Sequence, residues 1–222
     1  MKSPRSFLTH AERVAAFRAT DVYPVITTEF CRGGDPYPIA QAVLAGGAGI
    51  LQIREKSMCD GEFLPLVKRF RELTRAYGAL LIVDDRVDAA LAAEADGVHL
   101  GQEDFPLPDA RRIAPELLIG ASTHNEAEIL RAQREGCSYL NIGPIFPTQT
   151  KSLSYPFLGV ETLRRLAPLV KVPFSVMGGI KRESLPVLRE AGALHIAAVT
   201  AFTMAEDPAA EVAAWRRDLA GA

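Results

Sequence analysis

The chain has 222 residues, 48% of them hydrophobic, and a formal net charge of −2 at pH 7. This length and composition allow one large globular domain with a substantial core, and the near-neutral charge excludes a general attraction to nucleic acid or to an acidic membrane surface. No stretch approaches the ~20 consecutive apolar residues that span a bilayer, and charged residues interrupt any apolar signal core at the N-terminus. We therefore expect a cytoplasmic protein. The three scattered cysteines fit ordinary thiols better than a disulfide framework or a metal site.

Short β-branched runs alternate with longer amphipathic stretches along the chain, a pattern typical of repeated βα units around a parallel sheet. An additional helix is predicted at residues 6–19, with Phe7, Val14 and Phe17 on its apolar side. The predicted strands are 22–27, 49–54, 79–83, 97–100, 117–120, 139–142, 174–176 and 196–199, and the predicted helices that follow them are 36–45, 61–77, 87–95, 108–113, 125–135, 160–169, 182–191 and 208–219.

About eight βα units result, which is the number that closes a TIM barrel. The sequence therefore predicts an α/β protein with a single (β/α)8 TIM barrel over residues 21–222 and an N-terminal helical extension over residues 1–20. We expect the extension to cover the bottom of the barrel.

The segment 141–151, NIGPIFPTQTK, is the most informative loop. A Gly-Pro turn ends a predicted strand, and Thr148, Thr150 and Lys151 then present two hydroxyls and an ammonium group. Such a loop can bind phosphate, although threonine-rich surface loops with a lysine are also common.

Similar polar groups follow the other predicted strands. In a parallel barrel the carboxyl ends of all strands share one face, so these groups are expected to form one site. They are Gln52, Arg54 and Lys56; Asp84 and Asp85; Gln102 and Asp104; Ser122 and His124; Gly178 and Gly179; and Thr200.

The charges within this set suggest what the site binds. Arg54 and Lys56, together with the loop at 148–151, supply donors suited to a diphosphate. Asp85 and Asp104 can hold a hard divalent cation such as Mg²⁺, or they can form plain salt bridges with the neighbouring cations.

Backbone amides supply a second anion pocket. The pairs Gly178-Gly179 and Val199-Thr200 follow the seventh and eighth strands, where barrels often bind a phosphate. Two anion pockets imply two phosphorylated ligands, or one ligand with phosphate at both ends.

Five motifs occur in the order and spacing of a known family. They are QIREK at 52–56, DDRVD at 84–88, DGVHLGQED at 96–104, GPIFPT at 143–148 followed by Thr150 and Lys151, and GGI at 178–180. On these motifs the chain resembles the thiamine phosphate synthases over residues 23–208. The resemblance implies a transferase that condenses 4-amino-2-methyl-5-hydroxymethylpyrimidine diphosphate with a thiazole phosphate, giving thiamine phosphate and pyrophosphate. It also implies Mg²⁺ as cofactor and two phosphorylated small molecules as partners, and it leaves homo-oligomer formation open.

The resemblance further implies roles for single residues. Asp85 and Asp104 are expected to hold the magnesium ion, and Gln52 or Asp84 to orient the pyrimidine through hydrogen bonds. The expected catalytic residues are Arg54, Lys56, Ser122 and Lys151; the pyrimidine diphosphate is expected to bind Arg54, Lys56, Ser122, Thr148, Thr150 and Lys151, and the thiazole phosphate to bind Gly178, Gly179, Val199 and Thr200.

The chain departs from the family pattern at several positions. Asp84 stands where asparagine is usual, and the extra carboxylate could change metal binding or disfavour a diphosphate. Ser184 stands where asparagine is common, and His195 stands where glycine is common. Its ring either narrows the phosphate pocket at the eighth strand or lies at the start of that strand, away from the reacting face.

Two alternative functions stay open. The segment Ser122, Thr123 and His124 also resembles the related thiazole tautomerase, in which the histidine would act as acid and base. That reaction needs neither a metal nor a second phosphate pocket. The other alternative is a barrel that binds a phosphorylated metabolite without turning it over, which the substitutions at Asp84, Ser184 and His195 suggest.

Overall fold

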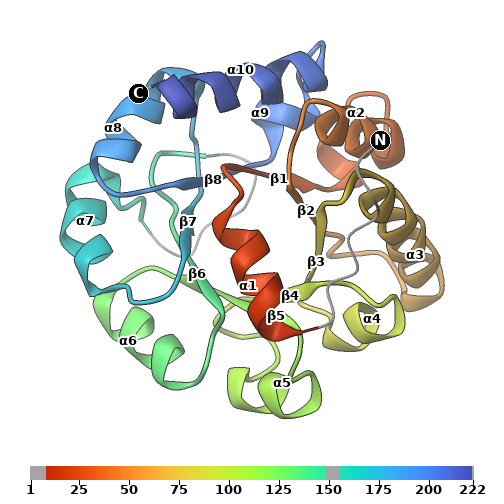
Figure 1. Ribbon diagram of the computed structural model, residues 1–222, viewed down its shortest axis with the longest axis horizontal. Coiled ribbons are helices and arrows are strands. Elements are labelled where there is room, and N and C mark those ends of the chain that lie inside the picture. The colour runs from red at the N-terminus through yellow and green to blue at the C-terminus, as the bar shows by residue number, and fades with distance from the viewer. Residues whose placement is uncertain (1–8, 149–155, 222) are drawn as a thin grey trace.

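Eight parallel strands close into a barrel in chain order, with β1 pairing to both β2 and β8 (Figure 1). The computed structural model describes residues 9–148 and 156–221. This confirms the predicted TIM barrel. The strands are β1 Val22–Ile26, β2 Ile50–Ile53, β3 Leu80–Asp84, β4 Gly97–Leu100, β5 Leu118–Thr123, β6 Tyr139–Ile142, β7 Phe174–Val176 and β8 His195–Ala198.

Helices form an outer ring around the strands (Figure 1). The predicted helix at 182–191 is divided by Pro186, giving a short 3-10 turn and then α8, and Pro168 likewise ends α7. The α-helices are α1 His10–Arg18, α2 Pro36–Ala45, α3 Asp60–Tyr77, α4 Val87–Ala92, α5 Leu107–Ile113, α6 Glu126–Arg134, α7 Gly159–Leu166, α8 Leu185–Glu190, α9 Thr200–Thr203 and α10 Pro208–Gly221, and the 3-10 helices are Thr28–Phe30, Ala167–Leu169 and Arg182–Ser184.

Two element boundaries differ from the prediction in ways that affect the site. Strand β5 continues through Gly120 to Thr123, so Ser122 lies on the strand and not in the loop after it. The glycine reads as a strand end in the sequence, but here it gives space to the ring of Tyr139. Strand β8 ends at Ala198, and Val199 precedes the four-residue helix α9, which is too short to have a periodic signal.

The core has two parts, because successive side chains of a strand point to opposite faces. Outward-facing strand residues pack against the helices in one large cluster. Inward-facing residues fill the barrel itself in a second cluster. That inner cluster comprises Tyr23, Ile50, Leu80, Ile82, Leu118, Tyr139 and Ala197, with Phe17 from α1.

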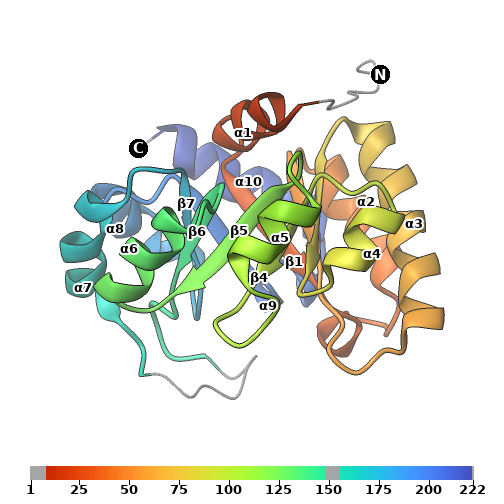
Figure 2. The same ribbon diagram turned by 90° about the horizontal axis from the view of Figure 1, so that it is seen from below.

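Helix α1 covers one end of the barrel, as predicted (Figures 1 and 2). The ring of Phe17 stacks on Tyr139 with 4.4 Å between centroids and meets Tyr23 edge-on at 6.2 Å. Val14 packs against the same inner cluster. Phe7, which was expected on this apolar side, lies outside the described residues.

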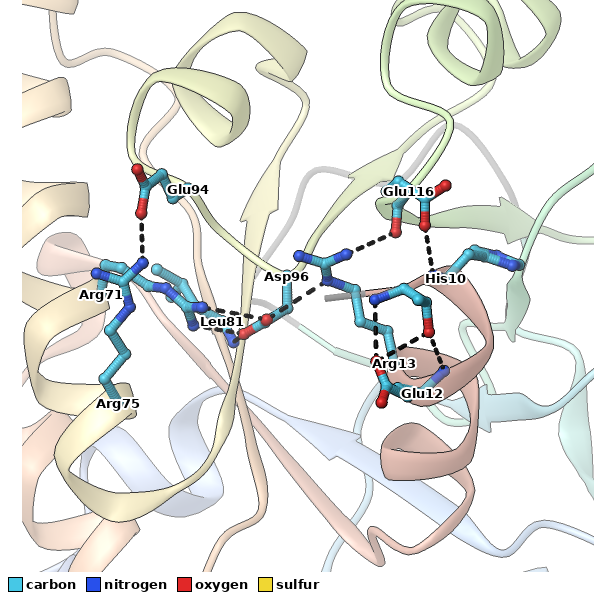
Figure 3. Close-up of polar contacts among 10 residues, drawn as sticks. His10, Glu12, Arg13, Arg71, Arg75, Leu81, Glu94, Asp96 and Glu116 are labelled. Carbon is cyan, nitrogen blue, oxygen red and sulfur yellow. Dashed lines mark hydrogen bonds and ion pairs between the residues drawn. The ribbon is translucent and has the colours of Figure 1, made fainter. Parts of the chain in front are cut away.

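A buried carboxylate ties α1 to the barrel (Figure 3). Asp96 is fully buried and accepts hydrogen bonds from Arg71 at 2.6 Å and from the Leu81 backbone N–H at 2.9 Å. Arg13 of α1 forms an ion pair with the same carboxylate at 3.6 Å and donates to the Glu116 carbonyl at 3.0 Å. One acid thus balances two buried guanidinium groups from α1 and α3.

Replacing Asp96 should therefore cost much of the protein's stability. In Asp96→Ala the two arginines stay buried without their counter-charge, so we expect the free energy of unfolding in urea to fall by about 3–5 kcal/mol. The exposed pair of Asp109 with Arg112 is the matched control, because Asp109→Ala should change it by less than about 1 kcal/mol. Equal effects of the two substitutions would contradict this account of α1 docking.

His195 lies at the start of β8 on the α1 side, so the second of the two alternatives for this residue is correct. Its side chain is buried against Phe17, with 4.9 Å between ring centroids, and its Nδ1 lies 3.3 Å from Thr20 Oγ1. Burial lowers the pKa of His195 to about 4. The ring is therefore neutral at pH 7 and belongs to the packing beneath the barrel.

This burial predicts a pH-dependent stability. The folded pKa lies below the unfolded value of 6.5, so as the pH falls the unfolded chain takes up the proton first. Stability is thus complete above about pH 6.5 and decreases down to about pH 4, by about 2 kcal/mol at pH 5. His195→Gln should abolish this component when urea unfolding is compared at pH 7 and pH 5. The same pH 5 loss in both proteins would contradict the assignment.

No helix among the described residues is both long enough and apolar enough to cross a membrane.

Candidate active site

A pocket lies at the carboxyl ends of the strands. These strand ends are at the end of the barrel opposite α1 (Figure 2). Every strand or the loop after it contributes to the lining. Of the residues singled out from the sequence, those that line it are Gln52, Arg54, Lys56, Asp84, Asp85, Asp104, Ser122, His124, Thr148, Gly178, Gly179, Val199 and Thr200. Thr150 and Lys151 lie outside the described residues.

Cations and carboxylates meet on one side of this pocket. Lys56 Nζ donates to Asp85 and lies 3.6 Å from Asp84 Oδ2, and Arg54 Nε lies 3.3 Å from the same Asp84 oxygen. Asp84 is the last residue of β3 and points into the barrel, where its side chain is 9% exposed. It therefore pairs with both cations that were expected to bind a diphosphate.

The pKa values of Asp84 and Asp85 are both raised in this arrangement. Burial and, to a smaller extent, the neighbouring Asp85 raise the pKa of Asp84 to about 7, against the opposite effect of Lys56 and Arg54. Burial also raises the pKa of Asp85, as does its hydrogen bond with Asp104, while Lys56 lowers it. Two carboxylates in hydrogen-bond contact can both be ionised only beside a strong positive charge.

Asp85 is held in an unusual backbone conformation. Its φ of 60° is left-handed, which costs energy for any residue other than glycine. The backbone N–H of Asp85 donates to the His99 carbonyl at 2.8 Å, which extends the β3–β4 pairing past the end of the strand. On the neighbouring loop, Asp104 Oδ2 accepts from the Gly101 N–H at 2.7 Å. Backbone hydrogen bonds thus hold both acids in place, through the main chain of Asp85 and through the carboxylate of Asp104.

The glycine pair after β7 adopts conformations that only glycine takes readily. Gly178 and Gly179 have φ of 102° and 60°, and a Cβ on Gly179 would lie 2.3 Å from the Pro147 carbonyl oxygen. The loop after β6 packs directly on this pair, since Phe146 N–H donates to the Gly178 carbonyl at 2.9 Å. The two proposed anion pockets are therefore joined through their backbones.

Comparisons with known proteins identify the family of this chain. A family model described as thiamine monophosphate synthase matches residues 22–202. The thiamine-phosphate synthase of Caldicellulosiruptor saccharolyticus is 37% identical over 201 residues, covering 90% of this chain and 91% of the relative, and that of Moorella thermoacetica is 41% identical over 191 residues, covering 86% and 91%. A solved structure of a Pyrococcus furiosus thiamine phosphate pyrophosphorylase superposes with a TM-score of 0.84 at 36% identity, over 91% of this chain and 96% of that one.

The chain belongs to the thiamine monophosphate synthase family. By family it is a thiamine-phosphate synthase, a transferase of thiamine biosynthesis. A 2-keto-3-deoxy-6-phospho-gluconate aldolase from Zymomonas mobilis, at 20% identity and a TM-score of 0.66, shares the fold alone.

Several pocket residues of this family member were not assigned a role from the sequence. Tyr23, His99, Asn141 and Met177 also line the pocket. The signal that could have found Tyr23, His99 and Asn141 is the period-two alternation of their strands, because each points inward with the residue two positions along. His124 was recognised, and its Nδ1 lies 2.8 Å from Glu128 Oε2.

Proposed function

We propose that this pocket joins 4-amino-2-methyl-5-hydroxymethylpyrimidine diphosphate to a thiazole phosphate, with Mg²⁺ as cofactor. The observation that carries the proposal is the meeting of Arg54 and Lys56 with Asp84, Asp85 and Asp104 at one mouth. A diphosphate brings negative charge, and a divalent cation brings positive charge. Together they match a site that contains both positively and negatively charged side chains.

The diphosphate is assigned to the cationic side of the pocket. Arg54 and Lys56 face the space where it would lie, and Thr148 faces it from the loop after β6. The same loop continues into Thr150 and Lys151, which we expect to add a hydroxyl and an ammonium group to the set. These donors stabilise the charge that develops on the leaving pyrophosphate.

The acids fit a magnesium ion. Asp85 and Asp104 are in hydrogen-bond contact, so the pair needs a proton or a cation between its oxygens. In the described part of the chain, no group of three or more His, Cys, Asp or Glu side chains is arranged so that it could hold one metal ion. Two carboxylates alone suit Mg²⁺, which usually completes its shell with water and substrate phosphate oxygens. When bound, the ion supplies positive charge to the diphosphate.

The reaction needs little covalent chemistry from the protein. The C–O bond of the pyrimidine diphosphate breaks with its electron pair going to pyrophosphate, which leaves a cation stabilised by the pyrimidine ring. The thiazole nitrogen then donates its lone pair to form the new C–N bond. The site must hold the two substrates in line, neutralise the leaving group and exclude water.

The thiazole phosphate is assigned to the second anion pocket. The backbone at Gly178 and Gly179 and the start of α9 at Val199 and Thr200 border it. Their N–H groups, rather than side-chain charge, would bind this phosphate.

We also propose a cytoplasmic location. All three cysteines are free thiols, which fits a reducing compartment.

Turnover, binding and isomerisation assays on the purified protein separate the three possible functions. Purified protein is mixed with Mg²⁺ and the two substrates, and pyrophosphate and thiamine phosphate are measured. Release that depends on both substrates supports the proposal, whereas binding without product would support a non-catalytic barrel. Isomerisation of a thiazole carboxylate phosphate on its own would support the tautomerase, for which His124 and Glu128 are the candidate acid–base pair.

Asp104→Asn tests the metal assignment. The amide keeps an acceptor for the Gly101 N–H but removes the charge, so turnover with Mg²⁺ should fall by about a hundredfold or more. Glu103→Gln, at the exposed neighbouring position, is the control and should retain activity. Full turnover by Asp104→Asn would contradict the role of Asp104.

A further inference from the structure

A continuous chain of hydrogen bonds leaves the pocket at Gln52, crosses the barrel interior and returns to the pocket at Ser122. Gln52 Nε2 donates to Tyr23 Oη at 2.9 Å, and the hydroxyls of Tyr23 and Tyr139 lie 3.0 Å apart. His99 then links Tyr139 Oη at 3.1 Å to Ser122 Oγ at 2.9 Å. Gln52 and Ser122 line the pocket, while Tyr139 is fully buried below it.

The ring of Tyr139 is enclosed on two sides. A Cβ on Gly120 would lie 2.2 Å from Tyr139 Cζ and 2.5 Å from His99 Nδ1, so only glycine lets the two rings meet there. From the opposite side, Phe17 stacks on the Tyr139 ring at an interplanar angle of 28°. Burial raises the pKa of both Tyr23 and Tyr139 above the ordinary value, so both hydroxyls keep their protons at neutral pH.

All hydrogen bonds of this chain must run in the same direction, because each hydroxyl and the neutral histidine ring has only one proton to donate. Because Gln52 Nε2 donates to Tyr23, the Tyr23 proton turns to Tyr139, and the Tyr139 proton turns to His99 Nδ1. A neutral His99 must then carry its proton on Nε2 and donate to Ser122. The Ser122 proton is left to point into the pocket, and the Gln52 amide retains its oxygen as an acceptor there.

The opposite direction has the same number of protons but requires all five groups to change together. Gln52 would turn its amide, the two tyrosine hydroxyls would rotate, the proton of His99 would move to Nδ1, and the Ser122 hydroxyl would turn to donate to His99 Nε2. Such chains are cooperative, since each bond polarises the next. The donor and acceptor characters at the two pocket ends are therefore coupled.

We propose that Tyr23, Tyr139 and His99 are positioning residues that set Gln52 as an acceptor and Ser122 as a donor, and thereby select the aminopyrimidine substrate. This inference rests on the proposed function. An aminopyrimidine ring presents an amino donor beside a ring-nitrogen acceptor, which complements this pair of ends. The corresponding oxopyrimidine presents an acceptor beside an N–H donor, which is the reverse.

The first experiment needs no ligand. Nitrogen chemical shifts of ¹⁵N-histidine-labelled protein report which ring nitrogen of His99 carries the proton, with His99→Gln to assign the signals. The wild-type protein should hold the proton on Nε2, and Tyr139→Phe should give a mixture of both forms. A mixture in the wild type, or a preference that Tyr139→Phe does not change, would overturn the proposal.

The second experiment measures selectivity. Dissociation constants for the aminopyrimidine diphosphate and its oxo counterpart are measured by calorimetry with Mg²⁺. The wild type should prefer the amino form, and Tyr139→Phe should reduce that preference by about five- to tenfold, as expected from the loss of one or two neutral hydrogen bonds. The KM for the thiazole phosphate should not change. An unchanged preference would contradict the proposal.

Phe17→Leu is the matched control, because Phe17 packs on the same Tyr139 ring without belonging to the hydrogen-bond chain. It should lower stability and leave the substrate preference as it is. If it reduces the preference as much as Tyr139→Phe does, the tyrosine has only a structural role. Failure of the wild type to form thiamine phosphate would instead reject the proposed function, and the ligand-free histidine measurement would still test the hydrogen-bond chain.

Discussion

The constraint on which the structure depends is the parallel closure of the barrel, which brings the carboxyl ends of all eight strands to one mouth. Residues as far apart in sequence as Gln52 and Thr200 line the same pocket for this reason. The closure also forces like charges together, so Asp84, Asp85 and Asp104 share a small volume with Arg54 and Lys56. Burial and this crowding together raise the pKa of Asp84 and Asp85, and the mixture of charges is the basis for the proposed binding of a metal ion and a polyanion.

The opposite end of the barrel is organised around stability. Helix α1 closes the inner core with Phe17 and is held by the buried charges of Arg13, Arg71 and Asp96 (Figure 3). The two ends meet inside the barrel, because Phe17 stacks on Tyr139, whose hydroxyl belongs to the hydrogen-bond chain that reaches the pocket. The ring of Tyr139 thus belongs to the packed core, and its hydroxyl belongs to the polar chain below the pocket.

Much of this could be predicted from the sequence, because strand periodicity and helix-ending glycines are local signals. The count of eight units, the helix before β1 and the pocket lining by Arg54, Asp85 or Gly179 followed from that periodicity and from the family motifs. Features that depend on tertiary packing could not be predicted from the sequence. Gly120 looks like a strand end until the ring of Tyr139 occupies its empty side, and the pairing of Asp84 with both cations follows from the neighbouring positions of β2 and β3. The predicted strand at 196–199 puts His195 at the start of β8, but the contacts of its ring with Phe17 and Thr20 depend on how α1 packs under the barrel.

A crystal structure of the protein with Mg²⁺ and pyrophosphate tests the central claim most directly. The account predicts one metal ion on the carboxylates of Asp85 and Asp104, with the pyrophosphate bridging from that ion to Arg54, Lys56 and the loop that begins at Thr148. Pyrophosphate bound at another surface, or a metal ion that contacts neither carboxylate, would contradict it.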